Sequence, residues 1–178
     1  MFKGRHSMKL AHNIGDIRHP NYNTRQQIID CEDEIGFDGI YRNVYVNQDC
    51  LIGKKGIMFI MGNFLGKDNA FDLAHVPQLE QYCTMEEVEE LCQKYNFELG
   101  WHTWSHRDLT KLPRDEIMYE VKAPFECKHF AYPYGTYNQL VIDCVKEAGY
   151  EKAYSVIQGS LNPYEVDYDY KIYRNYIQ

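Results

Sequence analysis

Short apolar or β-branched segments recur along the chain, and helical patterns separate several of them. Seven such segments predict strands, at residues 9–15, 34–39, 56–62, 97–102, 127–133, 152–157 and 171–177. Strands that alternate with helices at this spacing are typical of an α/β protein with parallel strands. In such folds the residues that do chemistry gather at the carboxyl ends of the strands.

Three segments between the predicted strands have the signals of helices. TMEEVEELCQKYN opens with Thr84 and has Glu87 three residues later, which is a capping box. PRDEIMYEVK opens with Pro113, a residue that favours the first turn, and NQLVIDCVKEAG runs from Asn138 to a stop at Gly149. The positions expected to face the core are Val88, Leu91, Cys92 and Tyr95 in the first helix and Leu140, Val141, Cys144, Val145 and Ala148 in the third.

Length and composition indicate one globular domain over residues 1–178. The chain carries 44% hydrophobic and 25% charged residues, and no repeat or low-complexity segment divides it. No apolar run is long enough to cross a bilayer. The formal charge is −7, and the basic residues are scattered, which argues against a nucleic-acid partner.

The amino-terminal segment and the cysteines bear on the compartment. MFKGRHSMKLAHNIGD has basic residues but no apolar segment followed by a small-residue cleavage site, so no signal peptide is evident. The six cysteines form no CxxC pair and no dense framework, which favours reduced or buried thiols. We therefore expect a cytoplasmic or phage-associated protein rather than a classically secreted one.

The segment LGWHTWSHRDL carries two histidines, His102 and His106, four residues apart. This spacing brings two imidazoles together on a helix face, and a loop after the strand FELGWH does so equally well. A shared metal ion is one interpretation. The other is structural, with polar histidines at a strand end beside Trp101 and Trp104 in the core, and spacing alone does not decide between them.

Two segments resemble motifs of the polysaccharide deacetylases, the family of chitin and peptidoglycan deacetylases. LGWHTWSHRDLTKL is similar to the second motif, H-[ST]-x-x-H, whose two histidines bind a divalent metal. HFAYPYGTYN resembles the third motif, in which a backbone N–H near the tyrosine helps to bind the tetrahedral oxyanion, here at Tyr134. The resemblance implies a distorted seven-stranded (β/α) barrel.

The first motif of that family is incomplete in this chain. The family ends its first strand with T-F-D-D-G, where the first aspartate is the general base and the second a metal ligand, whereas this chain has IGFDGIY. Asp38 directly precedes a glycine, so we assign it to the metal with His102 and His106. The position of the base then falls on Phe37 or is deleted, and Asp33 and Glu34 are candidate substitutes.

The third motif and the amino-terminal strand point to a permuted subgroup. Ala131 stands where many members have an arginine that orients the base, and the A-Y-P-Y-G variants share this difference. These variants resemble permuted deacetylases of poly-N-acetylglucosamine, in which an early Y-H-x-I strand supplies a catalytic histidine. KLAHNIGD resembles that strand with Ala11 in place of the tyrosine, so His12 is the candidate general acid. The remaining histidines, His6, His19, His75 and His129, stay unassigned.

The resemblance implies a metal-dependent hydrolase that removes N-acetyl groups from an amino-sugar glycan or oligosaccharide. The expected metal is divalent, zinc before others, and the expected catalytic residues are His12, Asp38 and Tyr134. One alternative is a degenerate deacetylase fold that binds carbohydrate or another partner, and a second is a hydrolase of another small amide. Four aromatic residues are candidates for sugar contacts, and core packing is the equally weighted alternative: Trp101, Trp104, Tyr132 and Tyr137.

Overall fold

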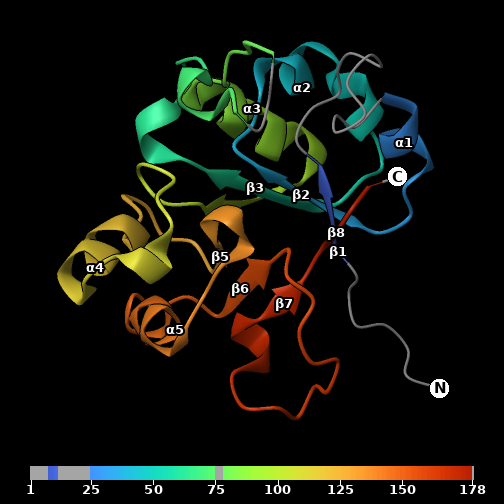
Figure 1. The fold of residues 1–178 in the computed structure, drawn as a ribbon. Helices are drawn as coiled ribbons and strands as arrows, with labels where there is room; N and C mark the ends of the chain where they lie inside the picture. The colour runs from blue at the N-terminus through green and yellow to red at the C-terminus, as the bar shows by residue number, and fades with distance from the viewer. Residues whose placement is uncertain (1–7, 12–24, 75–77, 178) are drawn as a thin grey trace.

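The computed structural model describes residues 8–11, 25–74 and 78–177. Eight strands form one sheet in the order β7-β6-β5-β4-β3-β2-β1-β8, and every neighbouring pair is parallel. The strands are β1 Met8–Ala11, β2 Glu34–Asp38, β3 Gly56–Ile60, β4 Glu98–Trp101, β5 His129–Ala131, β6 Lys152–Ser155, β7 Ile172–Tyr173 and β8 Asn175–Tyr176. The sheet curls into a nearly closed barrel, which confirms the predicted (β/α) barrel (Figure 1).

The last segment of the chain joins the two edges of this sheet. The predicted strand 171–177 divides into β7, which pairs with β6, and β8, which pairs with β1. Arg174 separates the two strands, and its amide donates to the Ser155 carbonyl at 3.0 Å. The Ile177 amide then donates to the Leu10 carbonyl at 3.0 Å. Residues 172–176 therefore pair with both edges of the sheet, and Arg174 lies at the point where the barrel closes.

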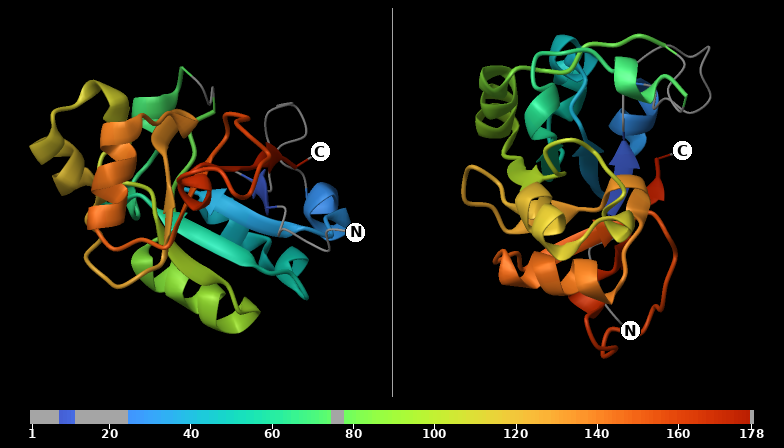
Figure 2. Two further views of the ribbon diagram at one scale, coloured as in Figure 1. Left: turned by 90° about the horizontal axis from the view of Figure 1, so that it is seen from below. Right: turned by 60° about the vertical axis from the view of Figure 1, so that its left-hand side comes forward.

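Helices lie on the outer side of the strands (Figures 1 and 2). They are α1 Arg25–Asp30, α2 Arg42–Val46, α3 Met85–Tyr95, α4 Arg114–Val121 and α5 Gln139–Glu147. The first two were not predicted, because each has about one and a half turns and too few residues to show a period. Short 3-10 turns fill several connections, including Ala70–Asp72 and Pro133–Gly135.

The three predicted helices form, with their predicted starts. Thr84 and Glu87 make the capping box of α3, and the Asn138 side chain accepts from the Val141 amide at the start of α5. Pro113 directly precedes α4. One predicted core position is wrong: Leu140 is 40% exposed, because the buried face of α5 is formed by Val141, Ile142, Cys144 and Val145.

All six cysteines are free thiols in the structure. Burial raises the pKa of Cys50 and Cys127 to about 11 and that of Cys83 and Cys92 to about 12. These thiols are therefore protonated at neutral pH, and they are poor nucleophiles. Within the ranges that the structure describes, none of the helices has the length and apolarity to cross a bilayer.

Candidate functional site

The barrel brings the predicted metal ligands to its carboxyl-terminal face. Asp38 is the last residue of β2, and His102 directly follows β4, with β3 between them. The His102 amide donates to the Ile60 carbonyl at the end of β3, at 2.8 Å. Parallel strands end at the same side of a sheet, so residues far apart in sequence meet here.

Asp38 forms a bidentate ion pair with Arg174. The guanidinium nitrogens lie 2.6 and 2.7 Å from the two carboxylate oxygens, and both side chains are buried. The guanidinium carbon also lies 5.2 Å from the centre of the Phe59 ring and 5.8 Å from that of Tyr154. Arg174 thus reaches through the closed barrel to Asp38, and sequence reasoning missed it. The available signal was one basic residue in the middle of the apolar segment KIYRNYI.

His102 is buried beside Asp38 in a defined orientation. Its Nδ1 lies 2.7 Å from the Ala131 carbonyl oxygen, and because a carbonyl only accepts, Nδ1 carries the proton. Its Nε2 lies 3.9 Å from Asp38 Oδ2. Burial lowers the pKa of His102 despite the nearby Asp38 carboxylate, so the imidazole is neutral at pH 7. A neutral imidazole whose other nitrogen binds a backbone carbonyl is the form that ligates metals.

His106 lies beside His102 on a strained loop. The two ring centres are 4.9 Å apart. Both Thr103 and His106 have positive φ, 70° and 57°, and the Thr103 hydroxyl accepts from the His106 amide at 2.9 Å. Left-handed conformations at non-glycine residues are costly and gather at functional sites, where surrounding contacts hold them in place.

Glu120 of α4 holds the loop that carries His106. One carboxylate oxygen accepts from the amides of Trp104 and Ser105 at 3.0 Å each, and the other accepts from the Ser105 hydroxyl. The Trp101 indole also donates to the Glu120 carbonyl at 2.9 Å. Glu120 is 2% exposed. This buried carboxylate, which the helical pattern did not single out, therefore positions the histidine loop.

Replacing Glu120 by alanine is expected to lower the free energy of unfolding by about 2–4 kcal/mol, because buried donors lose their charged acceptor. The measurement is urea denaturation followed by circular dichroism. Glu116→Ala is the matched control, since Glu116 lies on the same helix in an exposed ion pair with Arg107 and should change stability by less than about 1 kcal/mol. Equal effects of the two variants would refute the role of Glu120.

Tyr134 lies in the turn that follows β5. It has φ 60° and ψ 6° inside the turn Pro133–Gly135, and its ring centre is 4.7 Å from that of His106. The turn is tied to the histidine segment by Asp108, whose carboxylate accepts from the Thr136 hydroxyl at 2.8 Å. Partial burial alone would raise the pKa of Asp108, but hydrogen bonds from Thr110 and Thr136 lower it overall. The second and third motifs therefore form one connected unit.

The aromatic residues near these motifs divide by burial. Trp101 and Tyr132 are 0% and 1% exposed, so both belong to the core and neither offers a face to a sugar. Trp104 and Tyr137 are half-buried. Phe71, which no sequence motif indicated, lies in the turn Ala70–Asp72 of the connection between β3 and α3. Its ring centre is 5.8 Å from that of His106, and it is 41% exposed.

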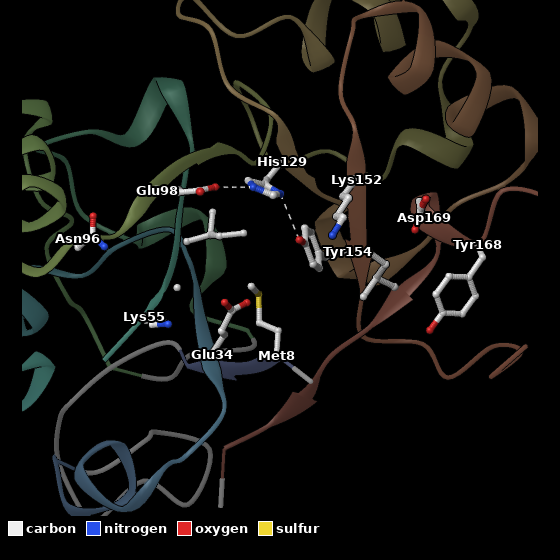
Figure 3. Close-up of a pocket in the computed structure, with 13 residues that line it drawn as sticks. Met8, Glu34, Lys55, Asn96, Glu98, His129, Lys152, Tyr154, Tyr168 and Asp169 are labelled. Atoms are coloured by element: carbon white, nitrogen blue, oxygen red, sulfur yellow. Dashed lines mark hydrogen bonds and ion pairs between the residues drawn. The ribbon is translucent and has the colours of Figure 1, made fainter. Parts of the chain in front are cut away.

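A separate pocket of about 530 Å³ opens at the other end of the barrel (Figure 3). It is lined by the first residues of several strands, among them Glu34, Glu98, His129 and Lys152. His129 Nε2 lies 2.6 Å from a Glu98 carboxylate oxygen, and its Nδ1 lies 3.1 Å from the Tyr154 hydroxyl. The amino-terminal face of such barrels contributes to stability, and this pocket holds none of the predicted metal ligands.

The side chains at the carboxyl face fit a divalent metal in their donor chemistry. His102 and His106 are adjacent imidazoles, and a carboxylate that accepts two guanidinium bonds keeps further lone pairs. In the described ranges, however, no three His, Cys, Asp or Glu side chains converge as a metal site, since Asp38 faces Arg174. The first aspartate of the family's first motif has no equivalent here, because Phe37, which directly precedes Asp38, is a core residue with 0% exposure. The candidate acid His12 lies outside the described residues.

Comparison with family models decides the assignment. The model described as polysaccharide deacetylase matches residues 53–153, which is more than half of the chain and includes the second and third motifs. The chain belongs to the polysaccharide deacetylase family. Members of this family are generally metal-dependent. No curated protein matches the sequence.

Solved structures of polysaccharide deacetylases share the fold at low identity. IcaB from Ammonifex degensii superposes with a TM-score of 0.74 at 12% identity, covering 97% of this chain and 91% of that one. BC0361, a polysaccharide deacetylase from Bacillus cereus, gives 0.75 at 15% identity, with 96% and 64% covered. A de-N-acetylase from Aggregatibacter actinomycetemcomitans gives 0.62 at 12%, with 96% and 94% covered. At these identities the likeness establishes the fold alone.

Proposed function

We propose that this polysaccharide deacetylase is a metal-dependent hydrolase that removes N-acetyl groups from amino-sugar glycans. The observation that carries the proposal is the adjacency of His102 and His106, with His102 neutral and its Nε2 directed toward Asp38. These side chains supply the donor types of a 2-His-1-carboxylate set, and a bound ion would bring the three together.

A divalent ion, zinc before others, would be held by His102 and His106 with Asp38 as the third donor, and it would supply a polarised acetamide carbonyl and an acidified water. The protein's own residues prepare that site. The Ala131 carbonyl fixes the tautomer of His102, and Glu120 holds the loop of His106. Arg174 fixes the Asp38 carboxylate in place, as a positioning residue.

The remaining steps concern charge and protons at the substrate. The Tyr134 ring centre lies 4.7 Å from that of His106, and a backbone N–H of this turn is the candidate donor to the negative oxygen of the tetrahedral intermediate. Asp38 is also a candidate acceptor of the water proton, and His12, which follows the end of β1, is the candidate donor to the departing amine. Ala11 pairs with Phe37, so the end of β1 lies next to the end of β2.

The proposal is tested by acetate release from N-acetylglucosamine oligomers. We expect the purified protein to release acetate, to lose this activity in EDTA and to regain it when zinc is added. Matched reactions with acetylated peptide test whether the substrate is a glycan. Metal binding without acetate release from any oligomer would contradict the proposal.

A second candidate is a degenerate deacetylase fold that binds carbohydrate without hydrolysis. One observation favours it: both oxygens of Asp38 are engaged by Arg174, and the position of the missing base is occupied by the buried Phe37. In that case the oligomers would bind but no acetate would form at any metal concentration.

A further inference from the structure

We propose that Phe71 and Tyr134 form a sugar-binding subsite on the His106 side of the site, where the apolar face of a pyranose ring packs against them. The proposal rests on the proposed function and specifies its substrate as an oligosaccharide rather than a small amide. Neither aromatic side chain was among the sugar contacts expected from the sequence, where Tyr134 was considered only for its backbone N–H.

The two aromatic rings lie next to one site histidine. The Tyr134 ring centre is 4.7 Å and the Phe71 ring centre 5.8 Å from that of His106, with interplanar angles of 63° and 59°. They come from different connections, Tyr134 from the turn after β5 and Phe71 from the connection between β3 and α3. A ligand at His106 therefore has an aromatic surface from each of these two connections beside it.

Both rings are accessible, in contrast to the aromatic residues below them. Phe71 is 41% and Tyr134 44% exposed, whereas Trp101 and Tyr132 are buried. Large apolar side chains that stay partly exposed at a polar site are typical of ligand contacts. An aromatic ring offers a flat apolar face, which matches the C–H face of a sugar ring.

Phe71 is held rigidly enough to act as a platform. Its ring stacks on Phe64 with centres 4.0 Å apart and an interplanar angle of 23°, and it lies 6.5 Å from the Tyr82 ring. Tyr82 in turn stacks on the buried Tyr41 at 4.5 Å. Because the row of rings fixes the orientation of Phe71, little conformational entropy is lost when a sugar binds.

The charge around the subsite suits an amino sugar. Asp72 belongs to the same turn as Phe71, and the chain carries a formal charge of −7. Glycan chains that have lost some acetyl groups carry ammonium groups, and this acidic surrounding attracts them.

The test is calorimetric binding of the N-acetylglucosamine tetramer in EDTA, with acetate release by the untreated protein measured alongside. We expect Phe71→Ala to raise Kd about tenfold or more, equivalent to roughly 1.4 kcal/mol, and Phe71→Trp to keep wild-type affinity. Leu161→Ala is the control, since Leu161 is 71% exposed in a different connection and its loss should leave Kd unchanged.

The outcomes separate this proposal from the proposed function. Wild-type affinity in Phe71→Ala, or no binding by the wild type, overturns the subsite even if acetate is released. Tetramer binding that depends on Phe71, without acetate release, supports the subsite and contradicts the proposed function.

Discussion

Replacing Arg174 by methionine is expected to lower the free energy of unfolding by about 3–5 kcal/mol, because it leaves the Asp38 carboxylate buried without its partner. Arg174 is 1% exposed and joins two segments that are 136 residues apart in sequence. It also stands between β7 and β8, so its side chain anchors the segment that closes the barrel. Urea denaturation followed by circular dichroism measures the change.

Two further variants isolate the ion pair in this experiment. The double variant Asp38→Asn with Arg174→Met removes both charges, and it should recover part of the stability that Arg174→Met loses. Arg174→Lys keeps the charge but cannot form two parallel hydrogen bonds, so it should fall between the wild type and Arg174→Met. If Arg174→Met is as stable as the wild type, the ion pair does not hold the barrel closed.

Replacing His102 by alanine is expected to abolish stoichiometric zinc binding and to reduce acetate release by about 10³-fold or more, since a bound metal supplies several kcal/mol of transition-state stabilisation. His102 fits this role because burial keeps it neutral and the Ala131 carbonyl orients it. Metal content by mass spectrometry and acetate release are measured on the same preparation, after circular dichroism has shown that the variant folds.

His106→Ala and His129→Gln complete this test. His106 is half-buried on a loop, so its replacement should remove the metal with less effect on folding. His129 lies at the opposite, amino-terminal face, in contact with Glu98 and Tyr154, and its replacement should leave the metal and the activity in place (Figure 3). Zinc retained by His102→Ala would exclude this histidine as a ligand.

The strands, the main helices and the barrel fold were predictable from the sequence. Each of the seven apolar segments overlaps a strand, and the capping residues Thr84 and Asn138 begin helices where predicted. These features are local, since a cap or a short apolar run acts within a few residues. The position of His102 is also a local property, because it directly follows the strand β4 and parallel strands all end at the same face of a barrel.

The contacts that shape the site were not predictable, because they depend on the closed barrel. Arg174 contacts Asp38 because the segment that carries it pairs with β6 at one edge of the sheet and with β1 at the other. The burial of Trp101 and Tyr132, and the exposure of Phe71, are likewise set by packing between distant segments. A motif defines which side chains are present, whereas tertiary structure determines which of them face solvent.

The most direct test of the proposed metal centre is a crystal structure of the protein grown with zinc, with an anomalous difference map at the zinc edge. We expect one strong peak in contact with His102 and His106, with the Asp38 carboxylate as a further ligand beside Arg174. A fully occupied zinc elsewhere, or no peak between the two imidazoles while the Asp38–Arg174 pair stays intact, would contradict it.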